Sequence, residues 1–337
     1  MPNAEQIEID GKSVRVSNVD KVYFPDRGFT KGDVVRYVIA VGPGLLRGLR
    51  DRPTTLQRYP DGIGGESFYQ KRVPKYLPDW IPTARIRFPS GRTADEMCPD
   101  NVAALVWAAN LGCLTFHPWP VRRADTEHPD ELRIDLDPQP GTDFADAARA
   151  AHEMRAVLAD HGLTAWPKTS GGRGLHLYVP IRPAWSFVEV RRAVIALGRE
   201  LEARMPDQVT MNWWKEERGR RVFVDYNQMA RDRTIAGAYS VRANPRATVS
   251  APLTWDEVDD AHPDDFDLAT MPERFDRLGD VHSDMPAHAF DLTAALDLAA
   301  RHERDTGHGD MPYPPDHPKM PGEPPRVQPS RARNKET

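Results

Sequence analysis

The chain has 337 residues, 39% of them hydrophobic, and a formal net charge of −5, so it can bury one large core or two smaller ones and is not uniformly basic. It has no apolar run near the roughly 18 residues of a membrane span, no signal-peptide core in residues 1–16, and only two cysteines, Cys98 and Cys113, without metal-site spacing. A membrane protein and a secreted disulfide scaffold are therefore excluded, and a soluble cytoplasmic protein is expected.

Residues 1–93 are predicted to form a basic segment of mixed helix and strand. Its lysines and arginines outnumber its acids, whereas 125–160 and 255–285 are rich in acids. This imbalance suits a protein that holds a polyanion on one side, although a solvated basic face without a ligand has the same composition. Thr30 is predicted to cap a helix that Gly42-Pro43-Gly44 interrupts. Strands are predicted at 54–59 and 67–73, around an Asp61-Gly62 turn.

Helices and strands alternate in the rest of the chain, which predicts a mixed α/β fold with α+β sheets. The predicted elements are a helix near 100–111, a strand at 132–138, a helix at 143–161 capped by Thr142, strands at 164–169 and 175–181, a helix from a Ser186–Glu189 capping box to about Met205, a strand at 221–226, and a Thr254–Glu257 capping box. Residues 303–337 are rich in proline, glycine and charge, and are predicted to form a disordered tail.

Two aspartates one residue apart end the strand at 132–138. Alternate side chains of a strand share a face, so the apolar residues are predicted to face a core while Arg133, Asp135 and Asp137 face outward together. The two carboxylates then start roughly 6.6 Å apart at Cα, where like charges repel unless a cation lies between them. A third acid, Asp225, ends another strand. A divalent metal pair bound to a nucleoside triphosphate best uses these acids.

A glycine-rich loop, residues 170–174, joins the strands at 164–169 and 175–181. Its backbone N–H groups can approach an anion closely, although an ordinary hairpin turn has the same sequence character. The loop matches neither a Walker A motif nor a dinucleotide fingerprint. His176, on the following strand, can donate to a phosphate or a sugar hydroxyl, or can be a satisfied core histidine. Arg242 is suited to bidentate phosphate contacts.

Taken together, these segments resemble the polymerase domain of bacterial DNA ligase D, in the archaeo-eukaryotic primase superfamily. The resemblance rests on Arg133-Ile-Asp-Leu-Asp-Pro138, Lys168-Thr-Ser-Gly-Gly-Arg-Gly-Leu-His176, Asp225-Tyr-Asn-Gln228 and Tyr239-Ser-Val-Arg242. It continues to about residue 300 in matching order and spacing. The implied fold is a two-lobed primase-polymerase catalytic core with an RRM-like module over residues 1–302.

The resemblance implies a template-dependent nucleotidyltransferase that fills short gaps or extends ends in DNA repair of the non-homologous end joining type. Ribonucleotides are the implied preferred substrates, and the implied location is the cytoplasm, at the nucleoid. Asp135, Asp137 and Asp225 would bind two Mn2+ or Mg2+ ions. The residues implied to contact the incoming NTP or dNTP are Lys168, Ser170, Gly171, Arg173, His176, Gln228 and Arg242.

The resemblance also implies contacts with DNA. Asn18, Lys21 and Lys31 would bind the 5′-phosphate of gapped or broken DNA. Phe68 and Tyr69 would contact the template; the family often has two phenylalanines before Glu-Lys, and here Tyr69 can still stack on a base. Another departure is His117-Pro-Trp-Pro-Val121, in the region that positions broken ends. No ligase or nuclease motif is visible, so a stand-alone polymerase is expected, with an ATP-dependent DNA ligase and an end-binding protein acting in trans.

Three other interpretations fit parts of the pattern. A DNA-end or gap-binding repair adaptor would use the basic segment and synthesise nothing. An Asp-x-Asp phosphohydrolase usually has Thr or Val two residues after its second acid, where this chain has Gln139. A sugar transferase that uses Asp-x-Asp would explain neither Lys21 and Lys31 nor the third acid.

Overall fold

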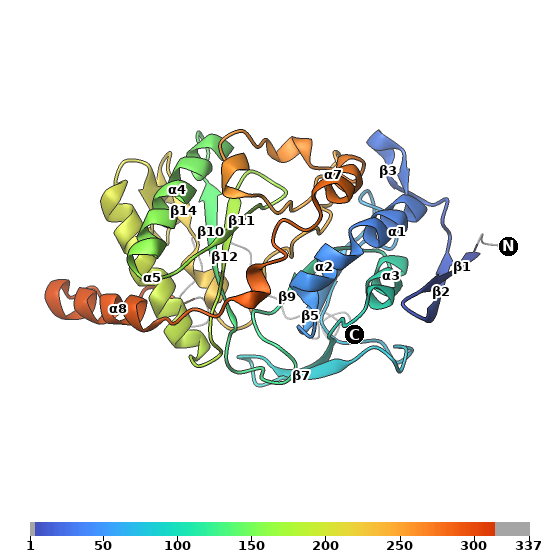
Figure 1. Cartoon of the computed structure of the whole chain (residues 1–337), viewed down its shortest axis with the longest axis horizontal. Helices are drawn as coiled ribbons and strands as arrows, with labels where there is room; N and C mark the ends of the chain where they lie inside the picture. Colours follow the sequence, from blue (N-terminus) through green and yellow to red (C-terminus); the bar gives the residue numbers. More distant parts are fainter. Residues whose placement is uncertain (1–3, 314–337) are drawn as a thin grey trace, which may run out of the picture.

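The computed structural model describes residues 4–313, which form two lobes around separate hydrophobic cores (Figure 1). Helices α4 (Phe144–Asp160) and α5 (Phe187–Arg204) belong to one lobe, here called the sheet lobe. Helices α1 (Lys31–Ala40), α2 (Gly42–Leu49) and α3 (Val102–Asn110) belong to the other, here called the basic lobe. No helix within residues 4–313 is long and apolar enough to span a bilayer.

The sheet lobe is built on a five-stranded sheet whose central strand carries the paired aspartates. The strand order is β11 (Trp166–Thr169), β12 (Leu175–Pro180), β10 (Glu131–Pro138), β14 (Val222–Val224) and β13 (Val209–Thr210). Along the chain, β10-α4-β11-β12-α5-β14 is a split β-α-β-β-α-β unit with antiparallel neighbours. This topology confirms the expected RRM-like module, to which β13 adds a strand parallel to β14.

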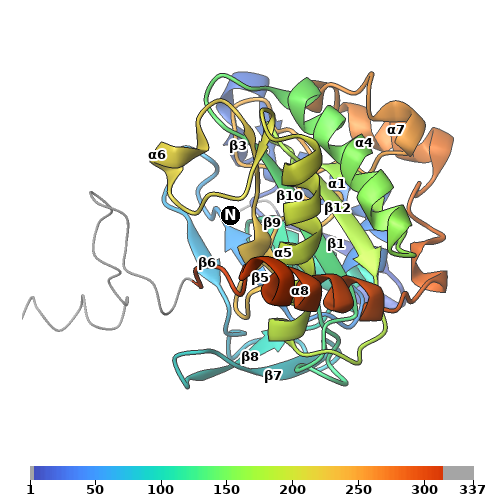
Figure 2. The same cartoon turned by 90° about the vertical axis from the view of Figure 1, so that its left-hand side faces the viewer.

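The two faces of β10 are covered by different parts of the molecule. Leu132, Ile134 and Leu136 are fully buried in the core that includes α4 and α5, as the strand pattern predicted. Figure 2 shows α4 and α5 on one side of the sheet. The prediction that Arg133 faces outward is wrong, because only 1% of it is exposed. The basic lobe packs over that end of the opposite face.

Helix caps decide where the predicted helices begin. Thr30 caps α1 as predicted and forms a capping box with Asp33, and Ser186 forms the predicted capping box with Glu189. The cap of α4 is Asp143 rather than the predicted Thr142, since the Asp143 carboxylate accepts from the Asp146 N–H at 3.2 Å. Thr142 instead donates to the Gln139 carbonyl at 2.8 Å.

The basic lobe contains a second five-stranded sheet and two small two-stranded sheets. The strand order is β6 (Phe68–Gln70), β5 (Thr54–Arg58), β8 (Thr93–Met97) and β7 (Thr83–Arg87), and β9 (Cys113–Pro118) also pairs with β5. The smaller sheets pair β1 (Ala4–Ile9) with β2 (Lys12–Ser17), and β3 (Val22–Phe24) with β4 (Phe29–Thr30). The segment Gly42-Pro43-Gly44 opens α2, where proline is tolerated because first-turn N–H groups have no helical acceptor.

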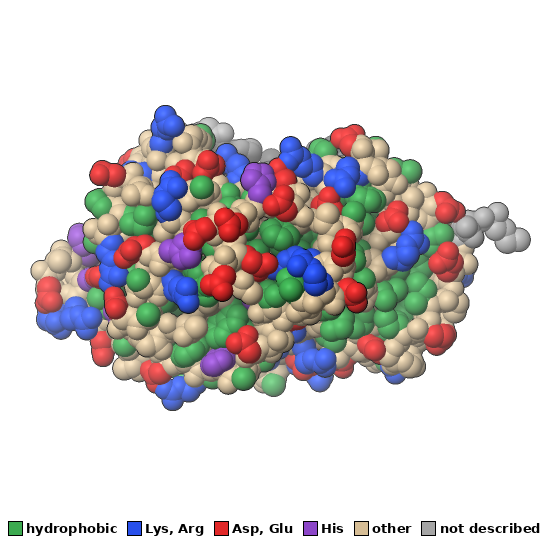
Figure 3. Space-filling view, turned by 45° about the horizontal axis from the view of Figure 1, so that its top comes forward, with side chains coloured by type: hydrophobic (Ala, Val, Ile, Leu, Met, Phe, Trp, Pro, Cys, Tyr) green, Lys and Arg blue, Asp and Glu red, His purple; other side chains and the backbone are tan. Residues whose placement is uncertain are grey.

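The chain returns to the basic lobe late in the sequence. Tyr239, Val241, Val249 and Met271 are buried in its core, and the Tyr37 hydroxyl donates to the Tyr239 carbonyl at 2.7 Å. The basic residues 1–93 therefore fold together with a segment almost 150 positions away rather than alone. Figure 3 shows one face of the molecule, on which cations and acids are interspersed.

The last described residues are ordered against the sheet lobe. The remaining helices are α6 (Lys215–Arg218), α7 (Thr270–Leu278) and α8 (Thr293–Thr306), with short 3-10 helices at Pro25–Arg27, Tyr226–Met229 (η2), Trp255–Glu257, Pro263–Asp265 and Met285–Ala287. The boundary expected at residue 303 falls inside α8, so the tail does not begin there. Residues 314–337, the rest of the predicted tail, lie outside the described residues.

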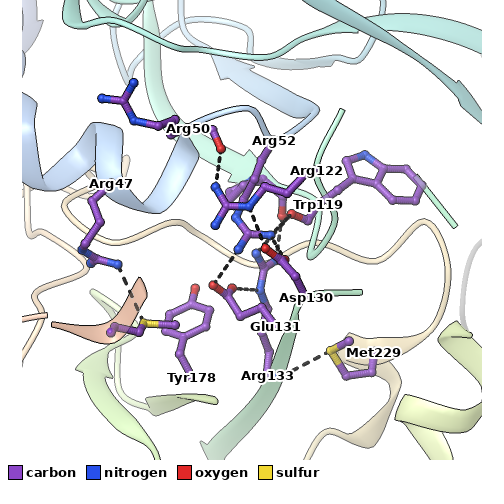
Figure 4. Close-up of polar contacts among 12 residues, drawn as sticks. Arg47, Arg50, Arg52, Trp119, Arg122, Asp130, Glu131, Arg133, Tyr178 and Met229 are labelled. Atoms are coloured by element: carbon purple, nitrogen blue, oxygen red, sulfur yellow. Dashed lines mark hydrogen bonds and ion pairs between the residues drawn. The ribbon is translucent and has the colours of Figure 1, made fainter. Parts of the chain in front are cut away.

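A buried group of ion pairs joins the two lobes (Figure 4). From β10, Arg133 donates to Glu131 Oε1 at 2.7 Å and to the carbonyl of Pro118, at the end of β9, at 2.6 Å. Arg52, before β5, forms ion pairs with Glu131 and with Asp130. These partners replace the water that would otherwise solvate the Arg133 guanidinium, and they allow the charged side chain to be buried.

Candidate active site

Three aspartates from distant positions meet at the end of β10. The Asp225 N–H donates to the Asp135 carbonyl at 2.9 Å, which continues the β10–β14 pairing by one residue. The Gln228 amide then donates to Asp225 Oδ2 at 2.9 Å and to Asp135 Oδ2 at 3.3 Å. Asp137 follows on the same face of β10, and its Oδ2 accepts from the Gln139 amide at 3.0 Å. The structure therefore brings together the three predicted acids.

The site is short of positive charge at its centre. Burial raises the pKa of Asp135 well above its ordinary value, and the neighbouring charges of Asp225 and Asp137 raise it further. Burial also raises the pKa of Asp225. Lys168 and Arg242 lower the pKa of Asp135 but do not outweigh these effects. A proton or a cation is needed to hold the acids together.

The donor set fits a hard divalent cation in its chemistry, although the ligands are not fully assembled. Among residues 4–313, no group of three or more His, Cys, Asp or Glu side chains is already arranged to hold a metal ion. Asp137 is turned toward Gln139. The three acids supply only carboxylate oxygens, which suit Mg2+ or Mn2+, and their mutual repulsion is what a cation relieves.

His176 lies between Asp135 and a buried lysine. Its Nε2 is 3.4 Å from Asp135 Oδ1, on the strand that pairs with β10. Its Nδ1 is 2.8 Å from the Lys168 ammonium, which also donates to Ser250 Oγ. Lys168 is fully buried, and burial lowers the pKa of both Lys168 and His176 well below their ordinary values. A ligand approaching from the site would therefore meet His176 before Lys168.

The glycine-rich loop forms a tight turn beside these groups. Ser170 Oγ accepts from the N–H groups of Gly172 and Gly174, each at 3.1 Å. Gly171 has φ +70°, and a Cβ there would lie 2.4 Å from Cγ of Arg242, so only glycine lets Arg242 pack over the loop. Arg173 is exposed, and its guanidinium donates to the Pro138 carbonyl at 3.3 Å.

The basic lobe contributes aromatic side chains to the same region. Phe68 and Tyr69 are 45% and 60% exposed on β6, as a stacking surface requires. The Tyr69 ring is 5.4 Å from that of His117. Burial, with Arg242, Lys168 and Arg133 nearby, lowers the pKa of His117 to about 3, so its ring is neutral. His117 belongs to β9, and nothing local in its sequence indicated its position beside Tyr69.

Asn18, Lys21 and Lys31 also come together, on the basic lobe. The Lys31 N–H donates to the Lys21 carbonyl at 2.8 Å, and the Lys21 N–H donates to the Asn18 carbonyl at 3.0 Å. The Lys31 ammonium donates to Ser17 O and Asn110 Oδ1 at 2.6 and 2.7 Å. Burial, then repulsion from Lys21 and Arg58, lowers the Lys31 pKa to about 8.

Lys21 is the more accessible of the two lysines. Its side chain is 37% exposed, and its ammonium donates to the Pro60 carbonyl at 2.9 Å and pairs with Asp61. The sequence indicated Asp61 only as part of a turn. An anion at this position would compete with the Asp61 carboxylate for Lys21.

A split β-α-β-β-α-β sheet with acids at the ends of its first and last strands is the arrangement expected of a primase-polymerase. The family model described as LigD, primase-polymerase domain, matches residues 30–282. The chain therefore belongs to the LigD primase-polymerase domain family.

Individual relatives agree with this family. The chain is 32% identical over 309 residues to the multifunctional non-homologous end joining protein LigD of Mycolicibacterium smegmatis, covering 91% of this chain and 40% of that protein. It is 34% identical over 268 residues to the bifunctional non-homologous end joining protein LigD of Bacillus subtilis. That match covers 79% of this chain and 43% of the relative. The chain thus spans less than half the length of these curated relatives.

A solved structure confirms the fold. The polymerase domain from Mycobacterium tuberculosis ligase D, determined in complex with DNA, matches with a TM-score of 0.75 and 33% sequence identity. The match covers 82% of this chain and 99% of that domain.

Proposed function

We propose that the chain is a template-dependent nucleotidyltransferase that fills short gaps or extends ends in DNA repair of the non-homologous end joining type. The observation that carries this proposal is the meeting of Asp135, Asp137 and Asp225 in a chain of this family. Relatives named for non-homologous end joining, and a relative solved with DNA, support the repair role. Ribonucleotides are the proposed preferred substrates.

The proposed reaction is attack of a primer 3′-hydroxyl on the α-phosphate of a nucleoside triphosphate. The new phosphodiester bond forms as the bond between the α- and β-phosphates breaks, pyrophosphate leaves, and the hydroxyl proton passes to water. Asp135, Asp137 and Asp225 would hold two Mn2+ or Mg2+ ions, which when bound favour the ionised hydroxyl and neutralise the triphosphate. Gln228 orients Asp135 and Asp225 through its amide. Asp137, whose Oδ2 accepts from the Gln139 amide, would supply the third carboxylate. Preorganised charges in the site, rather than a protein nucleophile, would supply most of the reduction in the activation barrier.

The nucleotide would lie between the glycine-rich loop and the acids. Arg242, packed over Gly171, presents a guanidinium suited to phosphate oxygens. His176 contacts Lys168 through Nδ1, and its Nε2, 3.4 Å from Asp135 Oδ1, would donate to a phosphate or a ribose hydroxyl. Ser170 shapes the loop through its two backbone contacts, and Arg173 stands at the exposed side. These contacts orient the triphosphate without chemistry of their own.

DNA would lie along the basic lobe. Phe68 and Tyr69 would stack on template bases, and Asn18, Lys21 and Lys31 would bind the downstream 5′-phosphate. An ATP-dependent DNA ligase would seal the product, and an end-binding protein would recruit the enzyme at the nucleoid.

Primer extension tests the proposed function. Open, gapped and 5′-phosphorylated gapped templates are compared with ribonucleotides or deoxyribonucleotides, in Mn2+ or Mg2+. Template-directed incorporation, greatest on the phosphorylated gap with ribonucleotides and Mn2+, is expected. Phosphate-dependent binding without incorporation in any combination would contradict the proposal and favour a repair adaptor.

Lys21→Ala is expected to remove most of the preference for a 5′-phosphorylated gap, because Lys21 is the accessible cation of the proposed phosphate site. One charge-assisted contact corresponds to a preference of about 10- to 100-fold. Extension of a simple primer-template should be unchanged. Lys75→Ala removes an exposed lysine of the same lobe and serves as the control. Equal loss on phosphorylated and unphosphorylated gaps would argue against a localised phosphate site.

The preference for a 5′-phosphate is also expected to depend on pH. The Lys31 pKa of about 8 means that Lys31 is charged below pH 8 and loses its charge as pH rises through that value. Because a bound phosphate favours the charged form, the loss should occur slightly above pH 8. Binding of phosphorylated and unphosphorylated gaps is compared from pH 7 to 9.5. Lys31→Met should flatten the profile, whereas an unchanged profile in this variant would exclude Lys31 as its cause.

A further inference from the structure

A buried arginine outside the proposed reaction links the end of the described chain to a catalytic acid. Arg191 lies on α5 and is only 3% exposed. Its Nη1 donates to Asp310 Oδ1 at 2.7 Å, and its Nη2 donates to the carbonyls of Met311 and Pro312 at 2.8 and 2.9 Å. Residues 310–312 are here called the strap. Figure 2 shows α8, which leads into the strap, crossing α5.

The same guanidinium also holds the 3-10 helix that follows Asp225. Arg191 Nε donates to Asn227 Oδ1 at 3.0 Å, and the Asn227 amide donates to the Pro312 carbonyl at 3.4 Å. The guanidinium lies 5.2 Å from the centre of the Tyr226 ring. Arg191 therefore contacts two consecutive residues of η2 as well as the strap.

The η2 helix in turn holds both oxygens of Asp225. The Asn227 N–H donates to Asp225 Oδ1 at 3.0 Å, and the Gln228 amide donates to Asp225 Oδ2 at 2.9 Å. A change in the position of Asn227 must therefore change the orientation of the Asp225 carboxylate. The contacts run without a gap from the strap through Arg191 and Asn227 to Asp225.

The charge of Arg191 makes the strap necessary to this arrangement. Asp310 is the carboxylate that pairs with it, and burying an arginine without such a partner is costly. Four of the five guanidinium N–H groups are used by the strap and Asn227 together. Without the strap, Arg191 would turn toward water and release Asn227. The strap lies outside residues 30–282, which match the family model.

We propose that Arg191 is a positioning residue for Asp225, and that the strap is part of the catalytic architecture because it holds Arg191 in place. This inference rests on the proposed function. Arg191 touches neither substrate nor reacting atoms, and acts through Asn227. Partners that orient metal-ligating side chains typically change metal affinity or activity by about 10- to 100-fold when they are replaced.

The test uses the full chain with Arg191→Lys, Asp310→Asn and the double variant. Arg191→Lys keeps the charge and removes the planar fork. We expect a decrease in kcat of about 10-fold or more, weaker Mn2+ binding by calorimetry, and little change in the KM for nucleotide. Asp310→Asn should cause a smaller decrease of the same kind. The double variant should be no worse than Arg191→Lys, because both changes break one chain of contacts.

The control is Arg192→Lys, which alters an adjacent arginine of α5 that pairs with Glu303 at the surface. It should leave kcat, Mn2+ binding and the melting temperature unchanged. If Arg191→Lys kept normal kcat and Mn2+ affinity, or if its effect added to that of Asp310→Asn, the inference would be wrong. Asp225→Asn separates the proposed function from the positioning role. Full incorporation activity in Asp225→Asn would contradict the proposed function. An inactive Asp225→Asn together with an Arg191→Lys variant of normal activity would contradict only the positioning role.

Discussion

Asp135→Asn is expected to lower the rate of nucleotide incorporation by about 10²- to 10³-fold, comparable to the loss of a central electrostatic group in other enzymes. Asp135 lies at the centre of the proposed site, beside His176, Asp225 and Gln228. Asparagine keeps the size of the side chain and removes the charge. Single-turnover incorporation of one nucleotide on a gapped template measures the effect directly.

The same variant should be as stable as the parent chain or more stable when no divalent cation is present. Folding raises the Asp135 pKa, so the folded state binds a proton more readily than the unfolded state, and the ionised carboxylate opposes folding at neutral pH. Asparagine removes this opposition. Thermal denaturation in a chelator is the measurement, and Asp256→Asn, at an exposed aspartate, is the control. An inactive but strongly destabilised Asp135→Asn would show that the acid is structural.

Glu131→Gln is expected to lower the free energy of unfolding by about 3–5 kcal/mol, the range for removing one partner of a buried ion pair. Glu131 accepts from Arg133 at 2.7 Å and from Arg52 at 3.2 Å, and all three side chains are at least nine-tenths buried (Figure 4). Glutamine keeps the shape but leaves two buried guanidinium groups without that charge. Urea denaturation measures the change.

Two comparisons identify the buried charge as the cause. Glu303→Gln breaks the exposed pair with Arg192 and should have little effect on stability. Burial opposes ionisation of Glu131, but Arg52 and Arg133 outweigh it and hold its pKa below the ordinary value. The stabilisation is thus present above the ordinary pKa and is lost as pH falls through the lower folded value. The difference between Glu131→Gln and the parent should therefore shrink in strong acid. Equal effects of the two variants at neutral pH would contradict this account.

Local sequence patterns were sufficient wherever the deciding contacts are local. The two-residue period of a strand placed Asp135 and Asp137 on one face of β10, and it also placed Leu132, Ile134 and Leu136 in the core. The Thr30 cap located the start of α1 and the Ser186–Glu189 capping box located that of α5, because a cap bonds only to the next turn. The cap of α4 was misplaced by one residue because Thr142 and Asp143 are adjacent and both can cap a helix.

Tertiary structure decided what covers each face and which distant residues meet there. The strand period showed that Arg133 and Asp135 share a face, but only the basic lobe buries Arg133 and adds the Pro118 carbonyl to the partner that its own strand supplies, Glu131. The β10–β14 pairing sets Asp225 beside Asp135, and the strap reaches Asn227 through Arg191. Apart from the Arg133–Glu131 pair within β10, these contacts join positions 15 to 121 residues apart. A charged side chain is stable in the interior only where the fold places a polar or charged partner beside it. A local sequence pattern does not show which distant residue will be that partner.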